Sequence, residues 1–186
     1  RAISSCEGAL LLIDAAQGVE AQTLANLYMA MEHDLSIIPV INKVDLISAD
    51  IEACLHQIDH DLGLDSDLAV QVSAKTGFGV DALFEAIVDQ IEAPTGRDSD
   101  PLRALIFDSH YDPYRGVIVH CRVFDGVMKT GSEIRFMHTG GVYKVEEVGI
   151  FQLDLIKGKE LEAGDVGYVI TGVKTISDVR VGDTIT

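Results

Sequence analysis

Cysteine, basic residues and long apolar runs are all scarce in this sequence of 186 residues. The three cysteines, Cys6, Cys54 and Cys121, lie far apart, which argues against a disulfide framework or a zinc ribbon and favours a reducing cytoplasm. The longest apolar runs are about five residues, whereas a membrane-spanning helix needs roughly 20. No signal peptide is recognisable, and the first residue is not Met, so we expect a cut from a longer protein.

Negative charge is concentrated in the first half of the sequence. The formal net charge is −16, with 14 basic residues against 30 acidic ones. Residues 1–93 contribute −13 and residues 94–186 contribute −3. An acidic surface repels phosphate backbones, so the second half is the better candidate for contacting nucleic acid. The change in composition coincides with a segment rich in Pro, Gly and polar residues at 94–100, which predicts a linker between domains at 1–93 and 101–186.

The first half alternates apolar runs with segments of helical period. We expect strands at 8–14, 35–41 and 69–72, helices at 21–33, 49–62 and 80–91, and a parallel sheet with right-handed crossovers. The spacing of apolar residues predicts the buried face of each helix. These residues are Leu24, Leu27, Tyr28 and Met31 in the first helix, Ile51, Leu55, Ile58 and Leu62 in the second, and Leu83, Phe84, Ile87, Val88 and Ile91 in the third.

The second half changes to short β-rich runs separated by glycines. These runs lie at 102–108, 116–124, 133–136, 141–150 and 167–170. Short strands with frequent turns indicate a compact β-barrel. The predicted fold class is therefore α/β followed by all-β.

The most informative motif is Asn42-Lys43-Val44-Asp45, which follows an apolar strand-like run. Open α/β sheets bind ligands at the carboxyl ends of their strands. There the Asp45 carboxylate can accept two hydrogen bonds from the ring N–H and exocyclic amine of guanine, a donor pair that adenine lacks. The Asn42 amide can donate toward the acceptors of guanine, and the methylene stem of Lys43 can cover the face of the base. The motif predicts a guanine-reading site.

A second motif, Ser73-Ala74-Lys75, follows the next strand. It resembles the S-A-K turn of guanine-nucleotide-binding proteins, which directs a backbone N–H toward the base oxygen, and the resemblance implies that the stem of Lys75 covers the other face of the ring. One predicted helix separates the two motifs, as neighbouring strands of a βαβ sheet require. We therefore expect Asn42, Lys43, Asp45, Ser73, Ala74 and Lys75 to hold the base together.

The elements that hold phosphate are missing from this sequence. No G-x-x-x-x-G-K-[ST] is present, and Gly126 to Gly131 has only its glycine spacing, in a hairpin context. D-x-x-G is absent too. Because phosphoryl transfer needs the phosphate loop and a magnesium ligand, we expect no GTP hydrolysis by these residues alone, no catalytic residue and no metal ligand among them.

Two further clusters have open interpretations. His56 and His60, with Asp59 beside them, have the spacing of a helical metal pair, but no third ligand is evident, so a solvated helix face is favoured. His110, Tyr111, Asp112 and Tyr114 precede Arg115. This cluster is either an RNA-contacting loop or an ordinary connection of the barrel.

The sequence resembles translational GTPases of the LepA type along essentially its whole length. The resemblance rests on residues 8–23, on the two motifs extended to Leu46 and Gly77, on the hairpin 122–131, and on the shorter stretches 102–109, 114–117, 149–151 and 181–184. It implies the latter half of a P-loop-type G domain followed by the domain II barrel of translation factors.

The resemblance implies that the parent protein binds GTP and GDP, uses Mg²⁺ through residues absent here, and couples GTP hydrolysis to elongation on the ribosome. It implies contact with the ribosome through domain II, contact with tRNA through absent domains, and a cytoplasmic location with peripheral attachment to the inner face of the bacterial membrane. If the chain is really this short, we expect self-association through an exposed sheet edge. The alternatives are a BipA-like or elongation factor G-like GTPase, a non-enzymatic RNA- or ribosome-binding module, and an unrelated α/β metabolic enzyme.

Overall fold

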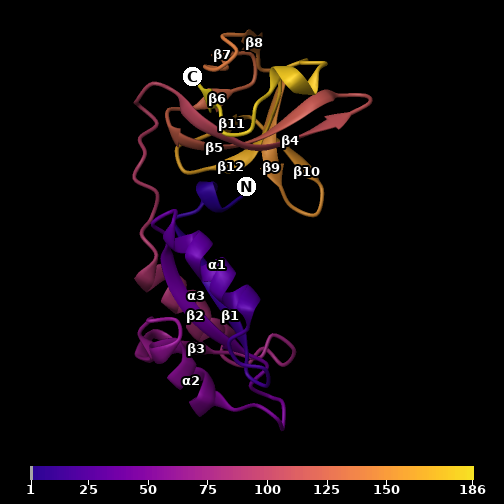
Figure 1. Cartoon of the computed structure of the whole chain (residues 1–186). Helices are drawn as coiled ribbons and strands as arrows, with labels where there is room; N and C mark the ends of the chain where they lie inside the picture. Colours follow the sequence, from indigo (N-terminus) through magenta and orange to yellow (C-terminus); the bar gives the residue numbers. More distant parts are fainter. Residues whose placement is uncertain (1) are drawn as a thin grey trace. The chain divides into compact units, whose positions relative to one another are not determined.

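A computed structural model describes residues 2–186, which form two compact units (Figure 1). The α/β unit comprises Cys6–Ala93. The β unit comprises Pro94–Thr186 together with the short 3-10 helix η1 (Ala2–Ser5). Among the described residues, no helix is long and apolar enough to cross a membrane.

The α/β unit is built on a three-stranded parallel sheet. Its strands β1 (Gly8–Asp14), β2 (Ser36–Asn42) and β3 (Val70–Gln71) lie in the order β1-β2-β3. Residues Ile38–Ile41 of β2 are buried, as expected for an apolar central strand with both faces covered. The predicted parallel sheet is thus confirmed, and β1 forms one edge of it in the described part of the chain.

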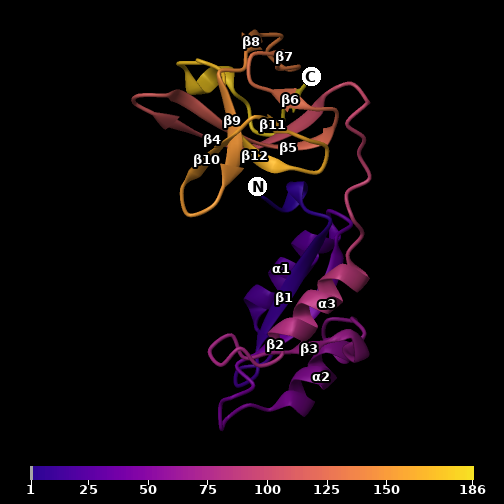
Figure 2. The same cartoon turned by 180° about the vertical axis from the view of Figure 1, so that it is seen from behind.

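Helices α1 (Ala21–Met31), α2 (Ile51–His60) and α3 (Val80–Gln90) cover the two faces of this sheet (Figures 1 and 2). Leu27 of α1 and Ile58 of α2 pack with Leu11 and Ile13 of β1 in one apolar cluster. Residues of α3 pack on the opposite face, against a cluster of Ile38, Val40 and Val72. Asp50 caps α2 by accepting a hydrogen bond from the N–H of Ala53 at 3.0 Å.

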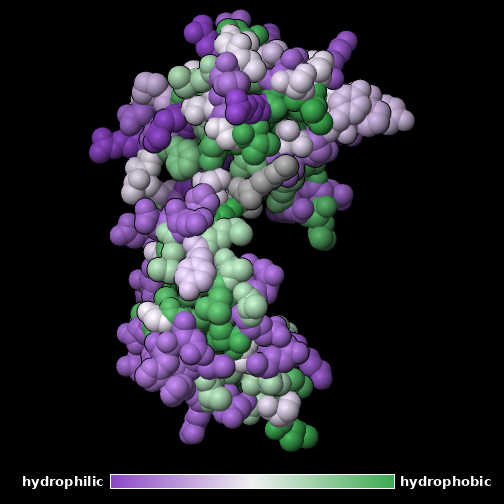
Figure 3. Space-filling model, in the orientation of Figure 1, coloured by the Kyte–Doolittle hydropathy of each residue, from purple (hydrophilic) through white to green (hydrophobic). Residues whose placement is uncertain are grey.

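The predicted inward faces of α1 and α3 are partly wrong. In α1 the buried residues are Thr23, Leu27 and Ala30, while Tyr28 and Met31 are exposed. The small side chains of Thr23 and Ala30 lie on the packed side of the helix, so the face is rotated from the one that the larger apolar residues mark. In α3, Phe84 and Val88 are exposed, and Leu83, Ala86, Ile87 and Ile91 pack against the sheet. Apolar side chains are accordingly visible at the surface over α1 and β1 in Figure 3.

The β unit is antiparallel throughout. Its main sheet has the order β10-β9-β12-β5-β4-β13, and two-stranded sheets pair β11 with β6 and β7 with β8. The strands are β4 (Arg103–Asp112), β5 (Gly116–Asp125), β6 (Met128–Lys129), β7 (Glu133–Arg135), β8 (Val142–Lys144), β9 (Glu147–Phe151), β10 (Leu155–Gly158), β11 (Glu160–Leu161), β12 (Val166–Ile170) and β13 (Thr184–Ile185), with a 3-10 turn η3 (Ile176–Asp178) before β13.

The run predicted at 141–150 forms two strands. The break lies at Val145 and Glu146, because the N–H of Val145 donates to Ser132 beside β7, whereas the N–H of Glu146 donates to Ile170 of β12. The chain therefore changes strand partner within one apolar run. The strand predicted at 102–108 is longer than expected and continues to Asp112, since the polar residues after Asp108 still pair with β5.

The residues that precede and follow the α/β unit in the sequence are hydrogen-bonded within the β unit. The carbonyl of Arg97 accepts from the N–H of Gly126, and the carboxylate of Asp98 accepts from the N–H of Ala163, both at 2.9 Å. The buried guanidinium of Arg122 donates to the carbonyl of Ser5 in η1 at 2.8 Å. The segment predicted as a linker at 94–100 and the helix η1 thus both pack on the β unit.

Candidate functional site

The ends of β2 and β3 bring the two sequence motifs side by side. Asn42 is the last residue of β2, and Ser73 follows β3 by one residue. The N–H of Val72 donates to the carbonyl of Ile41 at 2.8 Å, and the N–H of Val44 donates to the carbonyl of Val72 at 3.3 Å. The second bond ties the segment Asn42–Asp45 to Val72, the residue directly before the turn Ser73–Lys75.

Asp45 and Ser73 are joined across the two motifs. The hydroxyl of Ser73, which is fully buried, donates to Oδ1 of Asp45 at 2.6 Å and accepts from the N–H of Thr76 at 3.2 Å. Asp45 itself is exposed. A carboxylate has about four acceptor positions, so Asp45 keeps acceptor capacity for a ligand while Ser73 fixes its orientation.

Asn42 links the two motifs a second time. Its Oδ1 accepts from the N–H of Lys43 at 2.8 Å and from the N–H of Ala74 at 3.1 Å. The side-chain oxygen of Asn42 is therefore engaged inside the site, and its amide nitrogen remains as a donor. The N–H of Ala74, which we expected to face a base oxygen, is paired with Asn42 in this structure.

Lys43 is held in an unusual conformation. Its φ is 66°, in the left-handed region that residues with a Cβ rarely adopt. Its ammonium lies 2.6 Å from Oδ2 of Asp14, the last residue of β1. The hydrogen bond from Lys43 lowers the pKa of Asp14, and the same bond raises the pKa of Lys43. Lys75, at the far end of the second motif, is exposed.

Asp14 was missed as a site residue in the sequence. The available signal was its position at the carboxyl end of β1, whose register places it opposite Asn42. Two adjacent parallel strands end there in polar residues, which is where a ligand site is expected.

A cavity of about 400 Å³ lies beside the joined motifs. Asp45 and Ser73 line it together with Val44, Ile51, Gln71, Thr76 and Phe78. Apolar walls around one exposed carboxylate suit a flat heterocycle that offers donors to that carboxylate. Asn42, Lys43, Ala74 and Lys75 are not among the lining residues, so the cavity occupies one part of the candidate site.

The turn after Ser73 is shaped by short hydrogen bonds and by glycine. The N–H of Gly77 donates to the carbonyl of Ser73 at 2.8 Å, and the N–H of Ser73 donates to the carbonyl of Phe78 at 2.9 Å. Gly79 has a φ of 73°, and a Cβ there would overlap the carbonyl oxygen of Gln71. Only glycine can close this turn and begin α3 without displacing β3.

The two histidines of α2 lie close together without forming a larger ligand set. The rings of His56 and His60 are 4.1 Å apart, while the carboxylate of Asp59 accepts from both the N–H and the hydroxyl of Ser66. Across residues 2–186, no group of three or more His, Cys, Asp or Glu side chains is placed to hold a metal ion.

In the β unit, Tyr111 to Arg115 form the tip of the β4–β5 hairpin rather than a loose loop. Oδ1 of Asp112 accepts from the N–H groups of Tyr114 at 2.7 Å and Arg115 at 2.9 Å. This turn presents Tyr114 with 97% of its surface exposed. Both tyrosines and Arg115 line a cavity of about 330 Å³ with Lys174.

His110 is not part of that tip, since it lies within β4. Its Nδ1 is 2.9 Å from Nε2 of His120 on β5, and the ring of His120 packs on Phe151 with 4.3 Å between centroids. Burial lowers the pKa of His120. His110 therefore pairs with a neighbouring strand and does not join Tyr111 and Tyr114 in one surface.

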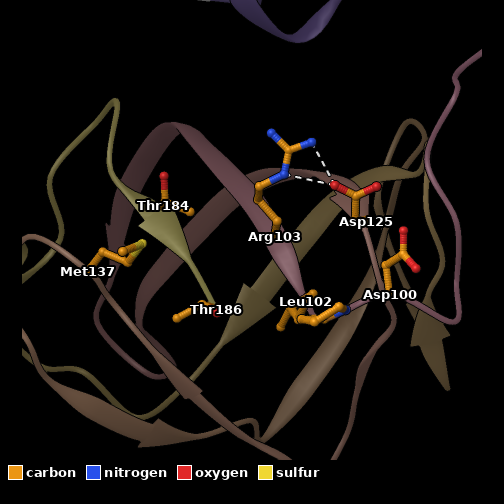
Figure 4. Close-up of a pocket in the computed structure, with 8 residues that line it drawn as sticks. Asp100, Leu102, Arg103, Asp125, Met137, Thr184 and Thr186 are labelled. Carbon is orange, nitrogen blue, oxygen red and sulfur yellow. Dashed lines mark hydrogen bonds and ion pairs between the residues drawn. The ribbon is translucent and has the colours of Figure 1, made fainter.

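A third cavity, of about 390 Å³, lies in the β unit (Figure 4). Arg103 of β4 and Asp125 of β5 meet at it, with Nη2 and Oδ2 2.6 Å apart. Figure 4 shows this ion pair above Leu102, with Met137 and Thr184 across the opening. The carboxylate of Asp100 also lines this cavity, together with the apolar side chains of Leu102 and Met137 and the hydroxyl groups of Thr184 and Thr186.

Comparison with protein families divides the chain much as its composition does. The model described as elongation factor Tu GTP binding domain matches residues 1–93, and the model described as elongation factor Tu domain 2 matches residues 116–186.

Curated relatives match over the entire chain. Elongation factor 4 of Treponema denticola is 68% identical over 186 residues, and elongation factor 4 of Syntrophobacter fumaroxidans is 66% identical over the same length. The chain spans 31% of the length of each, so it corresponds to about a third of these relatives.

Solved structures share the fold at low sequence identity. A crystal structure of a bacterial selenocysteine-specific elongation factor, EF-Sec, aligns with a TM-score of 0.74 at 22% identity, covering 98% of this chain and 32% of that one. The apo form of elongation factor SelB from Methanococcus maripaludis aligns with a TM-score of 0.79 at 22% identity, covering 98% and 40%. Together these likenesses confirm a parallel α/β sheet followed by an antiparallel β domain.

Proposed function

The chain belongs to the family of translational GTPases that carry the elongation factor Tu GTP binding domain, and all 186 of its residues match part of elongation factor 4. From this premise we propose that its α/β unit forms the guanine side of a GTP- and GDP-binding site. The proposed contacts are made by Asn42, Lys43, Asp45, Ser73, Ala74 and Lys75. The observation that carries the proposal is the bond between Ser73 and Asp45, which places an oriented, exposed carboxylate beside a cavity.

In this proposal Asp45 accepts the ring N–H and the exocyclic amine of guanine. A site that hydrogen-bonds a donor pair rejects an analogue lacking it by about 10⁴- to 10⁵-fold, because its polar groups would stay unpaired. The carbonyl oxygen of guanine takes over the N–H of Ala74 from Asn42, which then uses its amide as a donor to the base. The stems of Lys43 and Lys75 cover the faces of the ring.

The intact protein, in this proposal, hydrolyses GTP in step with elongation on the ribosome. None of the six residues acts as a general acid, a general base or a nucleophile in this proposal. The phosphate loop and the Mg²⁺ ligands belong to parts outside this sequence. These residues alone are therefore proposed to be catalytically inactive. We propose the cytoplasm as the location, residues 1–93 and 101–186 as the two domains, and 94–100 as the segment between them.

The test replaces the carboxylate of Asp45, which only accepts hydrogen bonds, by an amide that can also donate. With Asp45→Asn in the full-length protein, the amide can donate to the two-position oxygen of xanthine, so competition binding should show a shift of preference from GTP to XTP. Asp89→Asn, which removes an exposed carboxylate of α3, is the control and should leave the preference unchanged. An unaltered preference for GTP over XTP in Asp45→Asn would refute the assignment.

For the β unit, we propose contact with ribosomal RNA through the hairpin tip Tyr111–Arg115. An exposed Tyr114 on a hydrogen-bonded turn, beside Arg115 and Lys174, offers a stacking surface together with cations for phosphate. The β unit is also the less acidic half of the chain. A non-enzymatic ribosome-binding module would use the same surface, and the base-preference test above separates it from a GTPase.

Ribosome pelleting tests this surface. Tyr114→Ala combined with Arg115→Ala in the full-length protein should reduce the fraction that sediments with ribosomes, and the difference from the unaltered protein should shrink as salt rises, because the variant makes fewer phosphate contacts. Tyr28→Ala, which truncates an exposed tyrosine of the α/β unit, is the control. Equal sedimentation of the double variant and the control would contradict the proposed contact.

A further inference from the structure

The side chain of Asp14 makes two hydrogen bonds, one of which connects β1 to the proposed base site. Its Oδ2 lies 2.6 Å from the ammonium of Lys43, and its Oδ1 accepts from the N–H of Ala16 at 2.9 Å. The N–H of Ala15 donates to the carbonyl of Asn42 at 2.8 Å. The end of β1 is therefore joined to the first motif through both backbone and side chain.

Lys43 is fixed at both ends as a result. Its backbone, in the left-handed region, is held by the oxygen of Asn42, which accepts from its N–H. Its ammonium is held by Asp14, whose side chain is 17% exposed against 54% for Lys43. A lysine side chain carries considerable rotamer entropy, so an unheld Lys43 would sample many positions. With both ends held, its methylene stem is confined to one path.

We propose that Asp14 is a positioning residue for nucleotide binding, which holds the stem of Lys43 in place as one wall of the base site. This inference rests on the proposed function of that site. Asp14 does not touch the nucleotide, and it acts through Lys43 by removing the entropy that the lysine would otherwise lose on binding. Base preference stays with Asp45, so Asp14 governs affinity without governing specificity.

The test is a double-mutant cycle in the full-length protein, read by displacement of fluorescent GDP. Asp14→Asn keeps an oxygen for the N–H of Ala16 but loses the charge that holds Lys43. Lys43→Met keeps an apolar stem but loses the ammonium. Asp14→Asn should weaken GDP binding by about 1.5- to 5-fold when Lys43 is present, the range expected for a partly exposed ion pair. In the Lys43→Met background it should have no further effect.

Two controls vary the ionic strength and remove a carboxylate elsewhere in the α/β unit. The advantage of the unaltered protein over Asp14→Asn should shrink as ionic strength rises, because the ion pair is solvent-exposed on the lysine side. Asp89→Asn removes the same charge from α3 and should leave GDP affinity unchanged. A purely structural role of Asp14 would weaken binding equally in both backgrounds and would not depend on salt.

Two results would overturn the inference: no loss of affinity in Asp14→Asn, or an equal loss with and without Lys43. Failure of the proposed function looks different, because Asp45→Asn would then leave the preference for GTP over XTP unchanged. If Asp45→Asn shifts the preference while the cycle shows no coupling between Asp14 and Lys43, only the role of Asp14 is lost.

Discussion

Replacing Ser73 by Ala removes a buried hydroxyl that orients the base-reading carboxylate. Ser73 is fully buried, donates to Asp45 at 2.6 Å and accepts from the N–H of Thr76 at 3.2 Å. A hydrogen bond to a charged group contributes about 1.5–3 kcal/mol. Because Asp45 is exposed and water can replace one partner, we take the lower end, about 1.5 kcal/mol, which corresponds to roughly a tenfold change in an equilibrium constant.

Two assays read this change. Urea unfolding of Ser73→Ala should show a free energy of unfolding lower by about 1.5 kcal/mol, and GDP affinity of the full-length variant should fall roughly tenfold. The chain offers a matched control in Ser66, whose hydroxyl donates to Asp59 at 2.8 Å in an exposed position. Ser66→Ala should stay within about 0.5 kcal/mol of the unaltered chain, as surface substitutions do.

Burial is what distinguishes these two otherwise similar Ser–Asp bonds. An equal loss of stability in Ser66→Ala and Ser73→Ala would refute this role of burial, and so would a Ser73→Ala variant with unchanged stability and GDP affinity. A loss of stability without any loss of affinity would show that the hydroxyl supports the turn and does not orient Asp45.

Three further outcomes are expected. Gly79→Ala should destabilise the chain in urea by more than Gly77→Ala, because both have positive φ but only Gly79 lacks room for a Cβ, and equal losses would contradict this. Since burial lowers the pKa of His120 in the folded state, the unfolded chain binds the proton first, so stability should fall as pH drops below about 6.5. Urea unfolding at pH 7.5 and 5.5 should show less difference in His120→Gln than in the unaltered chain, and an equal difference would argue against it. Light scattering of the 186-residue chain should show self-association through the edge strand β1, and a uniform monomer would exclude it.

The parts of the fold that follow from local pattern were predictable from the sequence. β1, β2 and the three helices of the α/β unit lie within about two residues of their expected bounds, a usual error for element ends. The strands β6, β10, β11 and β13 are two to four residues long, too short to show a period, and were missed. The exposed Phe84 and Val88 show why apolar spacing alone misplaces a helix face, since it does not reveal how far the neighbouring sheet extends.

The candidate site was predictable where a motif coincides with a strand end. Asn42, Asp45 and Ser73 could be brought together because β2 and β3 are parallel neighbours. The ion pair of Lys43 with Asp14 could not, because the direction of a lysine side chain depends on its φ and on its surroundings. The pairing of the Ala74 N–H with Asn42 was likewise invisible, since it depends on distances between two loops.

The attachment of η1 to the β unit has a consequence for proteolysis. The polypeptide passes between the two units twice, after Ser5 and after Ala93. A protease that cuts only after Ala93 would break the backbone there. The fragment that precedes the cut would stay bound to the β unit through η1, whose Ser5 carbonyl accepts from the buried guanidinium of Arg122. The nicked fragments should therefore co-elute in gel filtration.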